Sequence, residues 1–254
     1  MSSVQSFYDE LAESYHLIFE DWDRSIARQG AALAGVLRER WDIASGNVLD
    51  AAVGIGTQAL GLAARNFHVM GSDVSLRALA RTRREAAARQ LAVPVVAADF
   101  RNLPFRDDTV DAVIVCDNAL PHLLSLHEIR RALVELQRCV RPRGAFVLSM
   151  RDYTEPLPEG TVERRPYGER VWNGRRYFAE QEWHWDGPTY RVVLRIRSLE
   201  DDSSNERIEV ATTYLAVPIS AILELMTEVG FDAVERIDDV YYQPLLLGTA
   251  PPAA

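Results

Sequence analysis

Three aspartates stand where the sequence predicts three successive strands to end, and two glycines follow the first of them. Asp50 precedes Gly54 and Gly56, and Asp73 and Asp99 come at the ends of the next two predicted strands. Glycine lets backbone N–H groups approach a ligand closely, although a tight strand-to-helix turn also needs glycine for steric reasons alone. A carboxylate beside such a loop suits an ammonium or amide donor better than a phosphate. An acid about twenty residues farther on is where a nucleotide ribose presents two hydroxyls.

A second group of polar residues follows the fourth and fifth predicted strands. Asn118 and His122 come after the fourth strand, and Arg151 comes directly after the fifth. Because strand ends in α/β sheets point into the ligand crevice, these side chains are candidates for contact with a substrate. Arg151 is either a bidentate clamp for a substrate carboxylate or the salt-bridge partner of a neighbouring acid. His122 is either a functional group or a capping and packing residue.

The first group resembles the class I S-adenosylmethionine-dependent methyltransferases over residues 1–150 and part of the C-terminus. The residues that carry this resemblance are Asp50, Gly54, Gly56, Asp73, Asp99 and Phe100. It implies that the methionine amino group lies near Asp50, the ribose at Asp73 and the adenine at Asp99-Phe100. The sequence departs from the family at Ala52, where glycine is frequent. The other residues assigned to the cofactor are Ala51, Thr57, Val74, Cys116, Arg28 and Tyr15.

The second group is similar to the glycine and glycine/sarcosine N-methyltransferases. The similarity rests on Asn118 with His122, on the Arg-Asp-Tyr run at 151–153 and on an aromatic N-terminal helix. It implies that Arg151 holds the carboxylate of a small amino acid and that Asn118 helps to seat it. Tyr8 lies near the position of a family tyrosine that faces the cofactor. The predicted catalytic residues are therefore Asn118, Arg151, His122 and Tyr8, and either His122 or water takes the proton of the amine.

Strands and helices alternate from residue 47 to 150, which is typical of a parallel sheet covered on both faces. Strands are predicted at 47–49, 68–73, 93–98, 110–116 and 145–150, and helices at 59–64, 76–91 and 127–141. A helix at 218–229 and strands at 231–238 and 241–249 follow near the C-terminus. Together with the resemblance, this order predicts an α/β fold with a doubly wound, mostly parallel, seven-stranded Rossmann-like sheet.

Residues between the fifth strand and the C-terminal helix change to a period of two. Residues 152–168 are rich in proline and glycine and are predicted to form a loop. Asp186-Gly187 and Asn173-Gly174 are typical of tight hairpin turns. Strands are predicted at 176–185, 189–197 and 206–216, with a polar run at 201–205 before the last. We expect an inserted antiparallel β-sheet.

Residues 4–41 carry apolar side chains at helical spacing and many aromatic side chains near the start. This segment is either an amphipathic helix packed on the domain or a mobile cover that excludes water from the site. In the second case Tyr8, Tyr15 and Arg28 are the polar residues able to face a ligand. The chain divides into an N-terminal helical cover (1–40), a cofactor-binding core (41–151), an inserted β lid (152–216) and a C-terminal helix with strands (217–254).

The composition excludes several classes of function. The net charge of −9 over 254 residues argues against a nucleic-acid partner. No run of about eighteen apolar residues and no signal-peptide pattern is present, so we expect no membrane association and a cytoplasmic location. Two cysteines fit a reducing compartment without disulfides. All 28 basic residues other than histidine are arginine, which excludes Schiff-base and P-loop lysine chemistry. We predict no metal site.

The leading hypothesis is a methyltransferase that uses S-adenosylmethionine, releases S-adenosylhomocysteine and methylates the amino group of glycine or another small carboxylated amine. Three alternatives stay open. One is a larger acceptor recognised by the aromatic residues of the insert, which are Trp172, Tyr177, Phe178, Trp183 and Trp185. Another is a nicotinamide-dependent dehydrogenase, since the glycines with Asp73 also fit that fingerprint. The last is a cofactor-binding protein without turnover. A small-molecule partner and a possible homo-oligomer complete the prediction.

Overall fold

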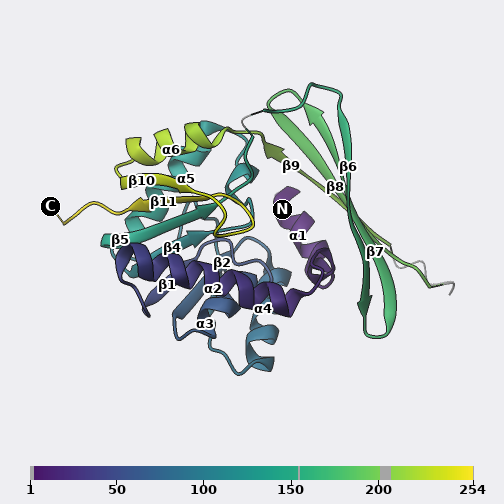
Figure 1. The fold of residues 1–254 in the computed structure, drawn as a ribbon, viewed down its shortest axis with the longest axis horizontal. Helices are drawn as coiled ribbons and strands as arrows, with labels where there is room; N and C mark the ends of the chain where they lie inside the picture. Colours follow the sequence, from purple (N-terminus) through teal and green to yellow (C-terminus); the bar gives the residue numbers. More distant parts are fainter. Residues whose placement is uncertain (1–2, 154, 201–206, 254) are drawn as a thin grey trace.

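The computed structural model describes residues 3–153, 155–200 and 207–253, which form two β-sheets (Figure 1). The larger sheet has seven strands: β1 (Asn47–Asp50), β2 (His68–Asp73), β3 (Val95–Ala97), β4 (Val110–Val115), β5 (Val140–Ser149), β10 (Asp232–Ile237) and β11 (Leu245–Thr249). The second has four: β6 (Val162–Trp172), β7 (Arg175–Asp186), β8 (Thr189–Ser198) and β9 (Arg207–Leu215). The predicted α/β fold with an inserted antiparallel sheet is confirmed.

The larger sheet is doubly wound and mostly parallel. Its order is β10-β11-β5-β4-β1-β2-β3, in which β3, β2, β1, β4 and β5 run parallel while β11 and β10 are antiparallel to their neighbours. The chain order reverses between β1 and β4, so the topological switch point lies there. Ligands of open α/β sheets bind outside the carboxyl ends of the strands at this point.

Helices cover both faces of the larger sheet because neighbouring residues of its central strands point to opposite sides. Val48 and Ile114 pack with helices α2, α3 and α4, whereas Leu49 and Val113 pack with α5 and α6. The bounds are α2 (Trp22–Trp41), α3 (Thr57–Ala63), α4 (Leu76–Ala88), α5 (Leu126–Cys139) and α6 (Ile219–Glu228). The two faces therefore have separate apolar cores. No helix in the described ranges is long and apolar enough to cross a membrane.

The single helix predicted for residues 4–41 is wrong, because the segment breaks into α1 (Ser3–Leu11), the 3-10 helix η1 (Tyr15–Ile18) and α2. Phe19 is extended, and the Asp21 side chain accepts a hydrogen bond from Arg24 N to start the next helix. Phe7 and Leu11 pack against apolar residues of the antiparallel sheet. Figure 1 shows α1 between the core and that sheet, so this segment joins the two parts.

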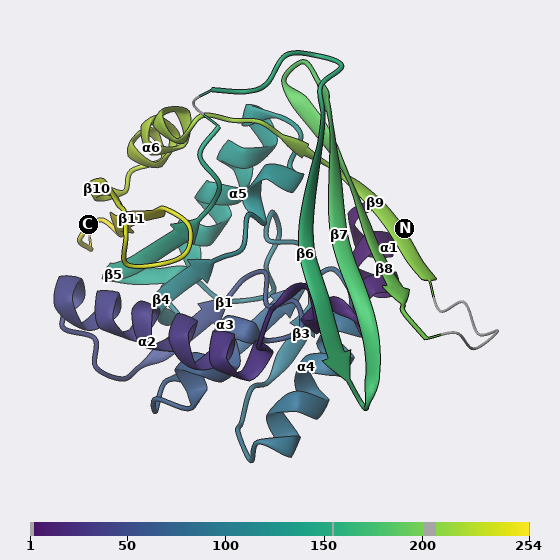
Figure 2. The ribbon, with the colours of Figure 1, turned by 45° about the vertical axis from the view of Figure 1, so that its right-hand side comes forward.

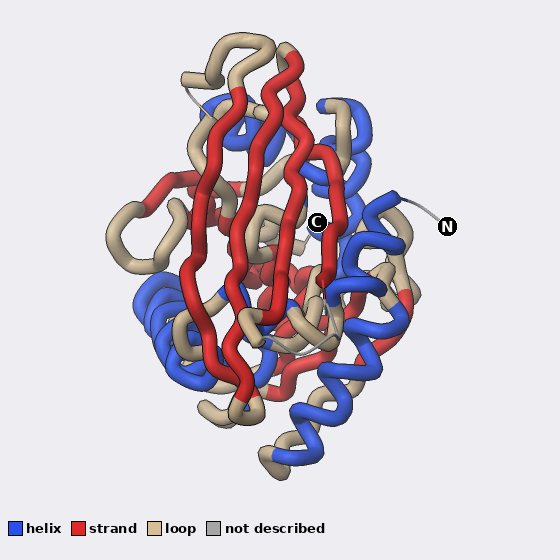
Figure 3. Tube along the Cα trace, turned by 90° about the vertical axis from the view of Figure 1, so that its right-hand side faces the viewer, coloured by secondary structure: helices blue, strands red, loops and turns tan. Residues whose placement is uncertain are grey.

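The loop predicted for residues 152–168 is wrong in its second half, because β6 starts at Val162. Pro166 and Gly168 lie in this strand, where the pairing with β7 shifts register. An edge strand tolerates a proline and a bulge, which is why the breaker residues do not end it. The predicted tight turns at 173–174 and 186–187 are present, and Asn173, Gly174 and Gly187 have positive φ. Figures 2 and 3 show the four long strands running side by side past the core.

Several predicted boundaries also shift. Helix α5 ends at Cys139, two residues early, because Val140 is already extended and pairs with Val110 of β4. The last strand starts at Leu245 rather than at residue 241. Residues 241–244 instead form a loop beside the carboxyl ends of the sheet. The predicted polar run at 201–205 lies outside the described residues.

Candidate active site

A cavity of about 540 Å³ lies at the carboxyl ends of β1, β2, β3 and β4. Nine residues predicted to bind the cofactor line it: Ala51, Gly54, Thr57, Asp73, Val74, Asp99, Phe100, Cys116 and Tyr15. Tyr8 and His122, which were predicted to be catalytic, line the same cavity. Gln58, Asp117 and Glu128 also line it and were not predicted. We name this space the cofactor cavity.

The glycine loop after β1 forms one wall of the cofactor cavity. Gly54 and Gly56 have φ of +51° and +96°, conformations that other residues rarely adopt. A Cβ built on Gly54 meets no atom within 4 Å, so this position faces open space. A Cβ on Gly56 would lie 3.1 Å from Thr82, so Gly56 serves the packing of the loop and does not line the cavity. The Thr82 hydroxyl donates to Gly54 O at 2.7 Å and fixes the turn.

Asp73 at the end of β2 is tied to the glycine loop. One carboxylate oxygen accepts from Gly54 N and the other from Ser75 N, both at 2.9 Å. Each oxygen keeps a further lone pair for a ligand hydroxyl. Burial raises the pKa of Asp73, and the backbone hydrogen bonds partly offset this. The arrangement can hold two vicinal hydroxyls.

Asp50 at the end of β1 is fully buried and does not itself line the cavity. Its Oδ1 accepts a weak hydrogen bond from Ala52 N at 3.4 Å, and its Oδ2 has no partner among the described residues. Burial raises the pKa of Asp50 to about 8. Ala51 and Ala52, which follow directly, line the cavity. A buried carboxylate oxygen without a donor fits a cationic ligand group that approaches along this loop.

Asp99 and Phe100 follow β3 and close the far end of the cofactor cavity. Asp99 accepts hydrogen bonds from the side chain and the backbone N–H of Arg101, which also pairs with Glu128. Although burial opposes it, the Arg101 hydrogen bonds lower the pKa of Asp99. Phe100 is half-buried and offers an apolar ring beside this polar cluster. A flat heterocycle with a polar edge fits between them.

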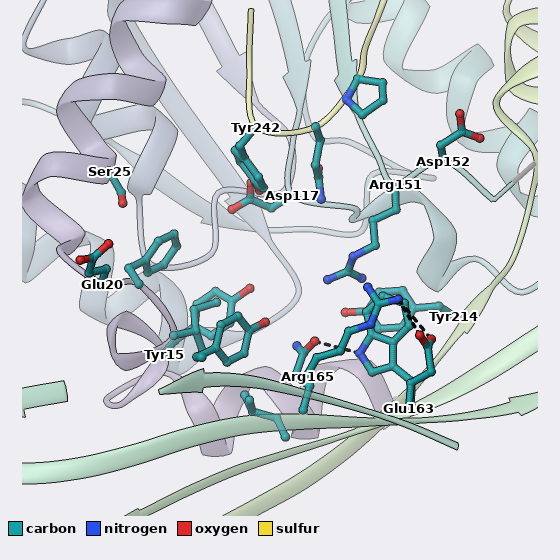
Figure 4. Close-up of a pocket in the computed structure, with 18 of the residues that line it drawn as sticks. Tyr15, Glu20, Ser25, Asp117, Arg151, Asp152, Glu163, Arg165, Tyr214 and Tyr242 are labelled. Carbon is teal, nitrogen blue, oxygen red and sulfur yellow. Dashed lines mark hydrogen bonds and ion pairs between the residues drawn. The ribbon is translucent and has the colours of Figure 1, made fainter. Parts of the chain in front are cut away.

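A second cavity of about 1040 Å³ lies between the carboxyl end of the core, the start of α2 and the antiparallel sheet (Figure 4). We name it the acceptor cavity. Its lining is rich in arginine and aromatic side chains: Arg24, Arg28, Arg151, Arg165, Tyr15, Phe19, Tyr167, Trp183, Trp185, Tyr214 and Tyr242. Arg28, predicted to contact the cofactor, therefore lies on this cavity. Of the insert aromatics, Trp172 and Tyr177 line a separate cavity of about 650 Å³.

Arg151 is a half-buried charged residue of the acceptor lining. Its guanidinium lies over the ring of Trp183 at 4.6 Å and donates to the Tyr190 hydroxyl at 3.2 Å. Arg165 stacks on the same ring at 3.7 Å but pairs with Glu163. Among the described residues no carboxylate lies within 4.0 Å of the Arg151 guanidinium. Arg151 is therefore not the salt-bridge partner of a neighbouring acid among these residues, and its guanidinium has N–H donors left for a ligand.

Asn118 lies inside the protein rather than on either cavity. Its amide donates to the Tyr153 hydroxyl at 2.9 Å, and its Oδ1 accepts from Arg151 N at 3.0 Å. Tyr153 and Tyr190 in turn contact each other through their hydroxyls. Asn118 therefore positions the backbone of Arg151 and the tyrosine pair, and a direct contact with an acceptor stays a prediction.

The two cavities share two residues, Tyr15 and Asp117. Asp117 accepts hydrogen bonds from the hydroxyls of Tyr242 and Tyr241, the latter at 3.5 Å. Burial raises the pKa of Asp117, while hydrogen bonds from Tyr242 and Gln58 lower it. Sequence reasoning passed over Asp117 in favour of its neighbour Asn118. The signal was present, since Asp117 is the first residue after the predicted strand 110–116.

His122 and Tyr8 form a pair on the cofactor side of this boundary. The Tyr8 hydroxyl and His122 Nε2 are 2.9 Å apart, and His122 Nδ1 is 3.4 Å from the Thr212 hydroxyl. Burial lowers the pKa of His122 to about 3, and the charge of Arg151 adds to this effect. The imidazole is therefore neutral at ordinary pH and joins α1 to the core.

These features fit S-adenosylmethionine in the cofactor cavity. Asp73 suits the ribose hydroxyls, Phe100 with Val74 suits the adenine ring, and the unpartnered Oδ2 of Asp50 suits the methionine ammonium. The individual roles stay predictions. The volume of the cavity and its place at the switch point agree with a ligand of this size.

Residues 48–144 match the methyltransferase domain family. The glycine/sarcosine N-methyltransferase of Parasynechococcus marenigrum (strain WH8102) is 26% identical over 237 residues, covering 92% of this chain and 79% of the relative. The demethylmenaquinone methyltransferase of Clavibacter sepedonicus is 32% identical over 169 residues, covering 65% of this chain and 62% of the relative.

The fold is similar to that of an S-adenosylmethionine-bound amino pentose methyltransferase from Micromonospora echinaspora. The TM-score is 0.73 at 21% identity, covering 89% of this chain and 92% of that one. These findings favour methyl transfer over the dehydrogenase and non-catalytic alternatives. The cavity at the switch point and the domain match over residues 48–144 together support a class I S-adenosylmethionine-dependent methyltransferase.

Proposed function

We propose that the protein methylates the amino group of a carboxylated amine, of which glycine is the smallest member. The observation that carries this is Arg151, a half-buried guanidinium that faces the acceptor cavity without a carboxylate partner among the described residues. A cation held between aromatic rings is a suitable clamp for a carboxylate. The similarity to a glycine/sarcosine N-methyltransferase supports the same choice.

The residues of the chain contribute binding, orientation and exclusion of water. The cofactor supplies a methyl group on a sulfonium that is already activated for attack. Arg151 would hold the acceptor carboxylate, while Tyr15 and Asp117 line both cavities and mark the boundary where the acceptor nitrogen has to lie. Alignment of two bound reactants can lower a barrier by roughly 7–11 kcal/mol. The acceptor ammonium first loses a proton, to water or to His122; its lone pair then forms the N–C bond as the S–C bond to the methyl group breaks and S-adenosylhomocysteine leaves. No acid–base dyad is required for such a reaction.

A larger acceptor is the second candidate, and the volume of the acceptor cavity favours it. A space of about 1040 Å³ is far larger than glycine needs. Trp185, Tyr167 and Tyr242 line it beyond the Arg151 region and offer flat apolar surface. The relatives named above include methyltransferases for a quinone precursor and for an amino pentose, which are larger molecules.

The experiment is incubation with methyl-labelled S-adenosylmethionine and a matched panel of acceptors. Glycine, sarcosine and dimethylglycine test small carboxylated amines, and phenylalanine tests a larger one. Methylamine and phenethylamine are the matched amines without a carboxylate. Label on carboxylated members only supports the proposal, and their relative rates separate small from large acceptors. Equal transfer to methylamine and glycine, or transfer to neither series, rejects it.

A further inference from the structure

Asp117 occupies a place that no other charged residue of the described chain occupies, since it lines both the cofactor cavity and the acceptor cavity. Its carboxylate accepts from two tyrosine hydroxyls, those of Tyr241 and Tyr242. No arginine or histidine of the described residues forms an ion pair with it. Figure 4 shows Asp117 at the core side of the acceptor cavity, below Tyr242. A carboxylate that accepts hydrogen bonds only from neutral groups keeps its negative charge uncompensated and has lone pairs left for a cationic ligand group.

The backbone holds Asp117 in this position at a conformational cost. Asp117 and Asn118 are consecutive residues with φ of +60° and +64°. Such a conformation is unfavourable for most residues, and aspartate and asparagine tolerate it better than other residues with a side chain. Asp117 N donates to the Ser149 hydroxyl at 2.9 Å, and Asn118 N donates to Ser149 O at 3.2 Å. This turn sends Asn118 into the interior and leaves Asp117 at the cavities.

Asp117 and Arg151 together present one negative and one positive group to the same cavity. They do not form an ion pair, because their charged atoms lie more than 4.0 Å apart. Figure 4 shows both groups at the core side of the cavity with space between them. Two unpaired charges of opposite sign are the complement of a zwitterion, which carries a carboxylate and an ammonium group.

We propose that Asp117 binds the ammonium group of the acceptor and so places its nitrogen at the boundary of the two cavities. This inference rests on the proposed function and adds the second pole of the acceptor site. With the carboxylate on Arg151 and the ammonium on Asp117, an amino acid has one orientation, and its nitrogen points toward the cofactor cavity. A carboxylic acid without an amine lacks the second contact.

An ammonium group reaches this boundary from two sources, because the methionine part of the cofactor carries one as well. The acceptor is the source that the structure favours. Asp117 shares the acceptor cavity with the unpaired Arg151, whereas Asp50, on the loop that lines the cofactor cavity, has a buried Oδ2 without a donor. Each ammonium thus has its own carboxylate. The two sources predict different losses of affinity and are separable by experiment.

The test is Asp117→Asn, which keeps the shape and the tolerance of positive φ but removes the charge. Glycine, glycolate and S-adenosylhomocysteine are titrated separately into wild type and variant, with tryptophan fluorescence and calorimetry as readouts. Glycolate is glycine with a hydroxyl in place of the ammonium. We expect glycine affinity to fall at least tenfold, while the affinities for glycolate and S-adenosylhomocysteine change less than twofold.

The matched control is Asp152→Asn. Asp152 lines the same cavity but accepts from Arg236 at 2.6 Å, and Figure 4 shows it turned away from Arg151. We expect its glycine affinity to stay within twofold of wild type. Unchanged glycine affinity in Asp117→Asn overturns the proposal, and an equal loss for S-adenosylhomocysteine assigns Asp117 to the cofactor instead. A wild-type protein that binds none of glycine, sarcosine and phenylalanine rejects the proposed function itself.

Discussion

The cofactor cavity and the acceptor cavity differ in how the chain builds them. The cofactor cavity lies in the turns that directly follow β1, β2, β3 and β4, and short-range backbone hydrogen bonds shape it. The acceptor cavity is assembled from side chains of α2, the segment after β5, the antiparallel sheet and the loop at 241–244. The difference teaches that regular topology creates the first cavity, whereas packing between separate layers creates the second.

This difference has a consequence for substitutions. A change at Arg151 in the acceptor lining removes contacts with the side chains of Trp183 and Tyr190, and among the described residues no hydrogen bond joins its side chain to the backbone. A change in the cofactor lining removes a group that also holds the backbone, as Asp73 holds Gly54. We therefore expect substitutions in the cofactor cavity to change both ligand affinity and stability. Substitutions in the acceptor cavity should change mainly the affinity for the acceptor.

The largest expected effect comes from Arg151→Ala. Loss of one partner of a buried charge pair costs about 2–5 kcal/mol, or roughly 30- to 5,000-fold in kcat/KM for a carboxylated amine. Arg151→Lys should recover little, because an ammonium does not form the bidentate fork and stacks less well on Trp183. Cofactor affinity should stay within twofold, measured by calorimetry with S-adenosylhomocysteine. An unchanged KM rejects the clamp, and an equal loss of cofactor affinity breaks the comparison of the two cavities.

Asp73→Ala is expected to weaken binding of the cofactor, whereas Arg151→Ala weakens binding of the acceptor. Hydrogen bonds to a charged group contribute about 1.5–3 kcal/mol, so affinity for S-adenosylhomocysteine should fall roughly 10- to 150-fold. Because Gly54 N and Ser75 N also lose their acceptor, thermal stability should fall as well. Asp73→Asn keeps one acceptor oxygen and is the matched variant with a smaller loss. Undiminished cofactor affinity in both variants would reject the ribose assignment.

Nine of the twelve residues that the sequence assigned to the cofactor line one cavity, because the signals that place them there are local. The spacing of Asp50, Gly54 and Asp73 follows from strand length and turn geometry, which repeat in every sheet of this type. The antiparallel sheet was predicted from alternation and from the turns at 173–174 and 187. Its first strand was missed because Pro166 and Gly168 are breakers everywhere except on an edge with a bulge.

The acceptor cavity was predicted only in part because its signals are not local. Arg151 was found from its place at a strand end. Two consecutive positive φ angles decide that Asp117, and not Asn118, faces the cavities. The alternation of residues along a strand does not predict these angles. The ring of Trp183 under Arg151 comes from a strand more than thirty residues away, so only packing brings the two together.

A proton-linked measurement sharpens the role of Asp50. Burial raises the pKa of Asp50 to about 8, so the free protein holds this proton at pH 6.5. If the ligand ammonium pairs with Asp50, binding of S-adenosylhomocysteine releases the proton, and affinity rises by up to about tenfold per pH unit below pH 8. Calorimetry in buffers of different ionisation enthalpy counts the proton, and Asp50→Asn should abolish the release.

The raised pKa of Asp50 also makes the stability of the folded protein depend on pH, which provides a second readout. The unfolded chain loses this proton near pH 4 and the folded protein near pH 8, so the free protein becomes less stable as pH rises between these values. Denaturation at pH 6 and pH 8 measures the decline, and Asp50→Asn should flatten it. No proton release and no decline would place Asp50 outside cofactor binding.

The smallest expected effect is that of His122→Gln, in the lining of the cofactor cavity. Because burial and the charge of Arg151 lower the pKa of His122 to about 3, the neutral ring does not titrate between pH 5 and 9. Glutamine keeps a donor and an acceptor for Tyr8 and Thr212, so kcat should fall less than about tenfold, with an unchanged pH profile. Tyr8→Phe removes only the hydroxyl and should give a loss of similar size. A drop of about a hundredfold or more, with a lost acid limb in the pH profile, would instead make His122 the acceptor of the amine proton.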